Sequence, residues 1–316
     1  MYILYIKYIY NIMNRGTEVL KYMYIKVLRK GNLFMKWIKL LLIGWLTLVV
    51  SLFLASLSGD ISAQLFGSSR DFQNFIKGLV MSGLVVPIVL YLYQHVYRMT
   101  GNKPSTPVYS WKRLYHFFTG VFLAIALASL GIIIAGYQGW LIIEDWHAPN
   151  QWYGPLLINI IFAFFYEALP EELGLRGLLY DVLRFRFATW LSVLLQTLLF
   201  VLVTIAVALI QALVGLTPGV SINIGYIILI LCFGLCLQLL RLWTGSLWTS
   251  IGFHLAYLEI MRFAISPHQY GVSPIITYDG SMPELGALIC VIMMVIGGII
   301  VSLVILGAKR FIRKST

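Results

Sequence analysis

Apolar stretches of about twenty residues recur along the whole 316-residue chain, and they limit the folds that it can adopt. A hydrocarbon core about 30 Å thick requires about 20 apolar residues in a helix. The chain is therefore predicted to be an all-α, polytopic membrane helix bundle with about eight transmembrane helices. The predicted spans are 37–57, 75–94, 115–137, 153–170, 187–214, 222–240, 246–265 and 286–307.

The composition supports the same class. Hydrophobic residues make up 60% of the chain and charged residues 11%, whereas globular domains carry about 25% charged residues. So few charges cannot cover a water-facing surface, which excludes an ordinary soluble fold. The three cysteines, Cys232, Cys236 and Cys290, lie within apolar runs and indicate neither a disulfide framework nor a zinc knuckle.

The distribution of charge predicts an orientation, because Lys and Arg are retained in the cytoplasmic loops of membrane proteins. Assigning alternate loops to the inner side places 20 of the 23 basic residues there and leaves Arg70, Lys77 and Arg262 outside. The predicted topology has both termini in the cytoplasm, and it explains the net charge of +11 without a nucleic-acid partner. The inner basic residues are Lys7, Arg15, Lys21, Lys26, Arg29, Lys30, Lys36, Lys39, Arg98, Lys103, Lys112, Arg113, Arg176, Arg184, Arg186, Arg241, Lys309, Arg310, Arg313 and Lys314. The acidic residues of the outer loops are Asp60, Asp71, Glu144, Asp145, Asp279 and Glu284.

Three parts follow from this topology: a basic N-terminal arm (1–36), a transmembrane bundle (37–308) and a basic cytoplasmic tail (309–316). The arm has no apolar stripe of helical period and is interpreted as an interfacial segment that touches anionic lipid. Met35 is an alternative natural start to Met1, because Met-Lys-Trp-Ile-Lys followed by an apolar run resembles the beginning of a membrane protein.

Ionisable residues inside a span cost about 2.5–3.5 kcal/mol on insertion scales, so each is a candidate for a functional site. Glu171, Glu172 and Arg176 follow Pro170 at the inner end of the fourth span. One interpretation is an ordinary helix start, where proline and acidic residues are both favoured. In the functional interpretation, Arg176 neutralises one carboxylate while the other faces a cavity, since adjacent helical residues point about 100° apart. The second arrangement suits a general base with a supporting ion pair.

His254 lies in the seventh predicted span, and the remaining acidic residues within the spans are Glu167 and Glu259. A lone histidine in an apolar helix is as often a satisfied structural group as a catalyst. At 1.5 Å per residue from Ser246, His254 lies about 12 Å from the inner end of its span. It would meet the glutamates there if the two spans are neighbours. Gly245 and Gly252 are predicted to allow the close helix approach that such a meeting needs.

These segments resemble the CPBP family of intramembrane proteases, which includes the CAAX prenyl endopeptidases and bacteriocin-processing or immunity-associated (Abi) relatives. The family pattern is Glu-Glu-x-x-x-Arg, then Phe-x-x-x-His, then His-x-x-x-Asn or Asp, on separate spans of an eight-helix bundle. Glu171, Glu172 and Arg176 match the first motif, and His254 matches the leading residue of the third. The likeness covers about residues 150–265.

Two positions depart from the family pattern. Thr204 stands where the second motif has its histidine, four residues after Phe200, and Leu258 stands where the third motif has Asn or Asp. The resemblance implies that these positions assist the water and stabilise the oxyanion. Loss of one oxyanion donor costs about 10²–10³ in rate, and loss of a proton-handling partner about 10²–10⁴. The two departures therefore leave two interpretations open, an active peptidase and a relative whose activity is severely reduced or absent.

The resemblance implies an intramembrane endopeptidase that hydrolyses a peptide bond near the cytoplasmic leaflet. Glu171 would act as general base, Glu172 and Arg176 would support it, and His254 would polarise the carbonyl. The alternative is a catalytically impaired relative that serves as a membrane scaffold, a chaperone or a bacteriocin-immunity protein. A small transporter is a third interpretation, with little support because no inverted repeat is detectable.

A catalytic zinc ion usually takes three protein ligands. Glu171, Glu172 and His254 nominally supply three, but the missing second histidine disfavours such a site, so we expect neither a metal nor another cofactor. The expected partners are membrane lipid and a peptide or membrane-anchored protein, as substrate or client. The expected location is a bacterial cell membrane, as an integral multi-pass protein.

Overall fold

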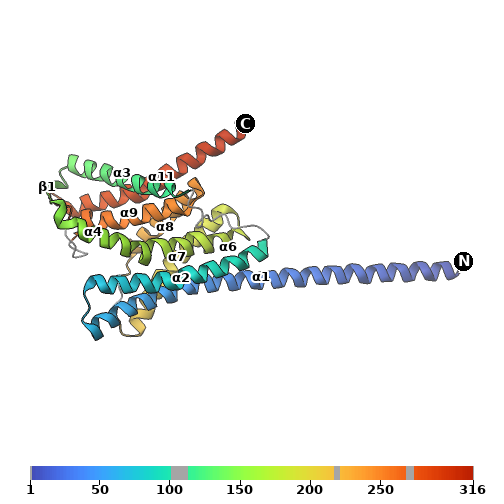
Figure 1. Cartoon of the computed structure of the whole chain (residues 1–316). Coiled ribbons are helices and arrows are strands. Elements are labelled where there is room, and N and C mark those ends of the chain that lie inside the picture. The colour runs from blue at the N-terminus through green and yellow to red at the C-terminus, as the bar shows by residue number, and fades with distance from the viewer. Residues whose placement is uncertain (1, 101–112, 217–220, 268–273, 316) are drawn as a thin grey trace. The chain divides into compact units, whose positions relative to one another are not determined.

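A computed structural model describes residues 2–100, 113–216, 221–267 and 274–315, so Met1, Lys103 and Lys112 lie outside the described residues. Seven helices in these ranges are long and apolar enough to cross a membrane. The architecture is an all-α polytopic bundle, which confirms the predicted fold class (Figure 1). The seven candidate spans are Phe34–Phe66, Arg70–Arg98, Tyr115–Tyr137, Pro149–Arg184, Thr189–Leu213, Ile224–Thr244 and Pro283–Ile312.

The first compact unit is Met1–Ile43, and its described residues lie in helix α1 (Tyr2–Phe66). The sequence showed no helical stripe in the arm, yet this helix is continuous. The absence of proline from the range 2–66 explains the continuity, because no residue there removes a backbone donor. Helices also cross both predicted boundaries, since α1 passes residue 36 and α11 (Pro283–Ser315) passes residue 308. The division into arm, bundle and tail stays a prediction.

The second unit, Gly44–Thr316, contains the remaining helices. Local signals set their ends. Helix α8 begins after Asn223, whose side-chain oxygen accepts a hydrogen bond from the Tyr226 N–H at 2.9 Å. It ends at Gly245, whose φ of 68° is the left-handed conformation typical of helix C-termini. The single helices of this unit are α2 (Arg70–Thr100), α3 (Tyr115–Tyr137), α7 (Thr189–Leu213), α8 (Ile224–Thr244), α9 (Leu247–Ile260) and α11.

The fourth span is one helical rod, Pro149–Arg184, in which α-helical and π-helical turns alternate. Pro170 lies between the two π-helical segments and cannot donate to the carbonyl of the preceding turn, where an α-helix would require a hydrogen bond. Wider π-turns are one way to accommodate such an interruption, and they occur frequently at functional sites. The segments are α4 (Pro149–Ala163), η2 (Phe164–Ala168), α5 (Leu169–Glu171), η3 (Glu172–Leu179) and α6 (Tyr180–Arg184).

Helix α9, continued by the π-helical η4 (Met261–Ile265), corresponds to the predicted seventh span but is not among the seven strongly apolar helices. It packs against α3, α8 and the rod of the fourth span. Nearly all of its side chains are buried. Because they face protein and not lipid, α9 accommodates polar residues that a lipid-facing helix would exclude.

The glycines of this region have a different role from the one that we predicted. A Cβ atom on Gly252 would lie 2.1 Å from the Phe117 carbonyl oxygen of α3, and one on Gly120 would lie 2.1 Å from the Thr249 carbonyl oxygen of α9. Gly252 thus allows α9 to approach α3 and not the fourth span, while Gly245 forms the left-handed turn before α9. The prediction that Gly245 and Gly252 allow α9 to approach the fourth span was therefore wrong.

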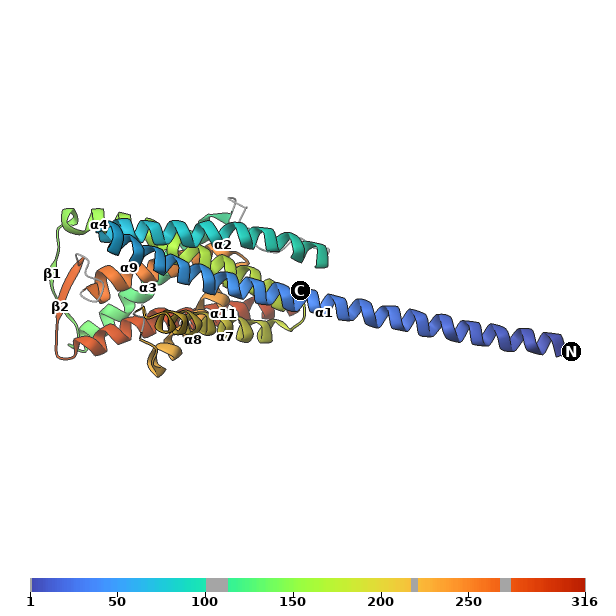
Figure 2. The ribbon, with the colours of Figure 1, turned by 90° about the horizontal axis from the view of Figure 1, so that it is seen from below.

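Charge is segregated between the two ends of this unit. At one end, β1 (Ile142–Trp146) pairs antiparallel with β2 (Ile276–Asp279), and the strands carry Glu144, Asp145 and Asp279 (Figure 2). At the other end, Arg113 donates to the Gly245 carbonyl at 3.1 Å, and Lys309 donates to the Trp243 carbonyl at 2.9 Å. These contacts bring together basic residues from α11 and from the start of α3.

Candidate active site

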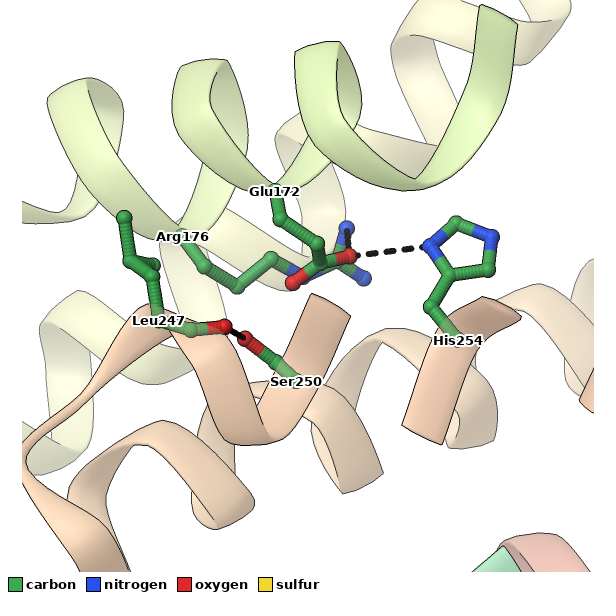
Figure 3. A network of polar contacts seen from close by, with 5 residues as sticks. All are labelled: Glu172, Arg176, Leu247, Ser250 and His254. Carbon is green, nitrogen blue, oxygen red and sulfur yellow. Dashed lines mark hydrogen bonds and ion pairs between the residues drawn. The ribbon is translucent and has the colours of Figure 1, made fainter. Parts of the chain in front are cut away.

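Three of the four predicted site residues meet in the interior of the bundle. Glu172 of η3 accepts a hydrogen bond from the His254 Nδ1–H of α9 at 3.1 Å (Figure 3). The Arg176 guanidinium lies 3.1 Å from the same carboxylate oxygen, as an ion pair one turn along the rod. The side chains of Glu172 and Arg176 are fully buried, and that of His254 is 4% exposed. The fourth and seventh predicted spans are therefore neighbours.

The Arg176 guanidinium is held mainly by packing and by its ion pair. Its central carbon lies 4.4 Å above the centre of the Phe200 ring, a cation–π contact from α7. Gly234 of α8 provides room, because a Cβ there would lie 2.9 Å from the Phe200 ring and 3.4 Å from Arg176 Nη2. None of the three guanidinium nitrogens makes a directed hydrogen bond to another described residue. Phe200, the first residue of the second motif, thus supports the arginine of the first.

The fourth predicted residue, Glu171, lines a cavity of about 430 Å³ together with His254. Within the described ranges its carboxylate has no hydrogen-bond or ion-pair partner. Thr204 and Leu258 line the same cavity, so both departures from the family pattern lie where the resemblance implies catalytic side chains. The other lining residues are Leu52, Ser56, Tyr166, Glu167, Phe200, Val207, Ala208, Gln211, Tyr226, Leu229, Ile230, Phe233, Tyr257 and Arg262.

The cavity has a second polar end that was not predicted from the sequence. Arg262 of η4 pairs with Glu167 of η2 at 2.5 Å and donates to Asn159 Oδ1 at 2.9 Å. The charge distribution predicts that Arg262 is one of three basic residues on the outer side. Its side chain is only 10% exposed, because it lies inside the bundle. Glu259 is also buried, and neither of its carboxylate oxygens has a hydrogen-bond partner among the described residues. The signal that identified Glu171, an ionisable residue inside a span, also applied to Arg262.

The electrostatic arrangement separates the two adjacent carboxylates. Arg176 and His254 hold Glu172, whereas Glu171 carries a carboxylate that no described cation neutralises by direct pairing. Because Glu172 accepts the Nδ1 proton of His254, the tautomer of the imidazole is fixed and Nε2 is the atom left for the cavity (Figure 3). The Nε2 atom is a hydrogen-bond acceptor in the neutral ring and a donor once the ring is protonated. The cavity wall therefore combines an unpaired carboxylate with an oriented imidazole.

The donor set does not form a metal centre. Among the residues that the structure describes, no group of three or more His, Cys, Asp or Glu side chains is placed to hold a metal ion. Glu172 is occupied by Arg176 and His254, and the position of the second-motif histidine is Thr204, which is not among the usual ligands of zinc.

Residues 152–258 match the family described as Rce1-like, type II CAAX prenyl endopeptidase Rce1-like. The match confirms, over these residues, the resemblance to the CAAX protease-like family seen in the sequence, and the seven apolar helices are those of a multi-pass integral membrane protein. The match includes the Glu-Glu-x-x-x-Arg segment, Thr204, His254 and Leu258. No curated protein and no solved structure matched the chain.

Proposed function

We propose that the protein is an intramembrane endopeptidase that hydrolyses a peptide bond in the cavity lined by Glu171 and His254. The observation that carries the proposal is the unpaired Glu171 carboxylate beside an imidazole whose orientation is fixed by Glu172. A carboxylate and an imidazole that face one cavity supply the base and the electrophilic donor that amide hydrolysis requires.

In the proposed reaction, Glu171 accepts a proton from a water molecule as the water oxygen attacks the peptide carbonyl carbon. The protonated His254 imidazole donates from Nε2 to the developing oxyanion. When the intermediate collapses, the C–N bond breaks and Glu171 returns its proton to the leaving nitrogen. Glu172 and Arg176 are positioning residues in this scheme, because Glu172 orients His254 and Arg176 balances the Glu172 charge.

The proposed orientation places the basic end of the bundle and both chain termini in the cytoplasm, in keeping with the location of most basic residues. The site is then in the half of the bundle nearer the cytoplasmic leaflet. The proposed substrate is a peptide or a membrane-anchored protein, and the proposed setting is a bacterial cell membrane.

The test is cleavage by the purified full-length protein in lipid nanodiscs, with a library of membrane-tethered, fluorescence-quenched peptides. Glu171→Gln and His254→Asn are expected to lower the cleavage rate by at least 100-fold. Glu259→Gln is the matched control, because it removes a buried carboxylate that does not line the cavity. Equal cleavage by the parent, Glu171→Gln and His254→Asn would exclude the assigned site.

A specific observation favours a second candidate function, that of a catalytically impaired scaffold, chaperone or bacteriocin-immunity protein. Thr204 and Leu258 replace two polar side chains of the family pattern inside the cavity itself. The scaffold interpretation predicts that Glu171→Ala preserves the cellular phenotype of the protein while a bundle-disrupting variant abolishes it. A phenotype lost in Glu171→Ala, at unchanged protein abundance, would contradict this interpretation.

A further inference from the structure

A second set of buried polar groups lies between Arg176 and the basic end of the bundle, outside the cavity lining. Gln196 and Thr197 are on α7, and Gln238 is on α8, with exposed fractions of 0, 5 and 0%. Neither amide group nor the Thr197 hydroxyl has a hydrogen-bond partner among the described residues, and the same holds for the nitrogens of Arg176. Gln196, Thr197 and Gln238 take no part in the proposed chemistry.

The groups lie near one junction of three helical segments, where Gln196 is one helical turn before Phe200 on α7. On α8, Gly234, Gln238 and Arg241 are spaced i, i+4, i+7, which places them on one helix face over about 10 Å. A Cβ on Gly234 would lie 3.4 Å from both Arg176 Nη2 and Thr197 Cγ2, so η3, α7 and α8 meet there. We call Arg176, Gln196, Thr197, Gln238 and Arg241 the polar column.

Arg241 forms the end of the polar column at the basic end of the bundle. Its Nη2 donates to Asp181 Oδ1 at 2.7 Å, while its Nη1 is buried and has no hydrogen-bond partner among the described residues. The Asp181 side chain is 11% exposed. The column therefore extends from the fully buried Glu172–Arg176 pair to a pair that begins to reach the surface.

The chemistry of the polar column selects its ligand. Buried polar groups in folded proteins are almost always hydrogen-bonded to protein or to ordered water, because an unpaired one is costly. The column has no net charge to bind an ion, since Glu172 balances Arg176, Asp181 balances Arg241, and the other members are neutral. An apolar ligand would leave the amides unpaired. Donors and acceptors from several side chains instead give water the two to four partners that a buried water molecule needs.

We propose that the polar column is a binding site for a chain of ordered water molecules, which connects the basic end of the bundle with the Glu172–Arg176 pair. Hydration of the column does not depend on catalysis. Its role as the supply of water for peptide hydrolysis rests on the proposed function.

The first test measures magnetisation transfer from water to side-chain amides by solid-state NMR, on the full-length protein in lipid bilayers. The amides of Gln196 and Gln238, assigned by their loss in Gln196→Leu and Gln238→Leu, are expected to receive magnetisation as fast as the exposed Gln138. Transfer as slow as that to the Trp45 indole N–H, which donates to the Leu199 carbonyl within the bundle, would overturn the proposal.

A matched control uses Ser192 of α7, which is also fully buried. Its hydroxyl already donates to the Ala188 carbonyl at 3.0 Å, so Ser192→Ala is expected to leave transfer to both amides unchanged. The opposite outcome is that Ser192→Ala slows the transfer as much as Gln196→Leu or Gln238→Leu does. Any change in α7 would then close the column, and the assignment of the water site to these amides would be overturned.

The second test is the melting temperature (Tm) of the double variant Gln196→Leu/Gln238→Leu. In a hydrated column, two leucines displace water that Arg176 uses, so Tm is expected to fall. In a dry column, the same change removes two unsatisfied amides, so an unchanged or higher Tm overturns the proposal. A hydrated column in a protein without peptidase activity would refute only the proposed function, and a dry column in an active peptidase would refute only the water site.

Discussion

Arg176→Met tests whether the buried ion pair holds the site together. The guanidinium is fully buried, and its partners are the Glu172 carboxylate and the Phe200 ring. Removing it leaves the buried Glu172 with His254 alone, while its second oxygen already has no partner among the described residues. Breaking a buried pair from one side costs about 3–5 kcal/mol, because an uncompensated charge remains. We expect the free energy of unfolding to fall by that amount.

The assay is reversible unfolding in mixed micelles, followed by tryptophan fluorescence and helical circular dichroism. The double variant Arg176→Met/Glu172→Met completes a double-mutant cycle, since it removes both charges and leaves no buried ion behind. We expect it to be more stable than Arg176→Met by at least about 2 kcal/mol, because replacing a whole buried pair by apolar groups is often nearly neutral.

An exposed arginine serves as the control for these variants. Arg310→Met removes an exposed guanidinium from α11 and is expected to change stability by no more than about 0.5 kcal/mol. Two outcomes would contradict this reasoning: a fall in the free energy of unfolding below about 1 kcal/mol in Arg176→Met, or a double variant as unstable as Arg176→Met. Either would show that Arg176 does not compensate the buried charge of Glu172.

Three further predictions follow from the site and its surroundings. Thr204→His/Leu258→Asn restores two side chains of the family pattern in the cavity, and it is expected to raise the peptide cleavage rate at least tenfold over the parent protein; an unchanged rate would count against catalysis at this cavity. Gly252→Ala forces α9 away from the Phe117 carbonyl of α3, so unfolding in mixed micelles is expected to require about 1–3 kcal/mol less; parental stability would contradict the close helix approach. Arg262→Leu leaves its partly buried partner Glu167 without this ion pair, with an expected loss of about 1–3 kcal/mol in the free energy of unfolding by the same assay; a loss below about 0.5 kcal/mol would show that the pair is not structural.

Much of the fold was predictable because membrane-spanning segments are selected by length and apolarity, which are local properties. The first-motif residues and His254 were predictable for a related reason, since charges inside apolar runs are conspicuous. Neither argument depends on knowing which helices are neighbours. The pairing of Glu172 with His254 does depend on it, and only the structure places these side chains 3.1 Å apart.

Other features required information that the sequence does not display. The π-helical turns around Pro170 change which side chains face the cavity, and an ideal 3.6-residue period does not anticipate them. Gly252 was assigned to the wrong neighbour because a small residue indicates close packing but not the partner. Arg262 was overlooked because a basic residue near a span end fits a topology signal as well as it fits a buried pair.

The polarity of α9 has a consequence for how the protein is made. The seven candidate spans have the length and apolarity of membrane-crossing helices, whereas α9 is only 14 residues long, carries His254 and Glu259 and is not among them. We expect α9 to leave the insertion channel by packing directly against α3 and α8, which are earlier in the chain and are already inserted when α9 emerges. The helix that supplies the imidazole would then be the last part of the domain to be secured, so defects in biogenesis would affect the site before they affect the rest of the bundle.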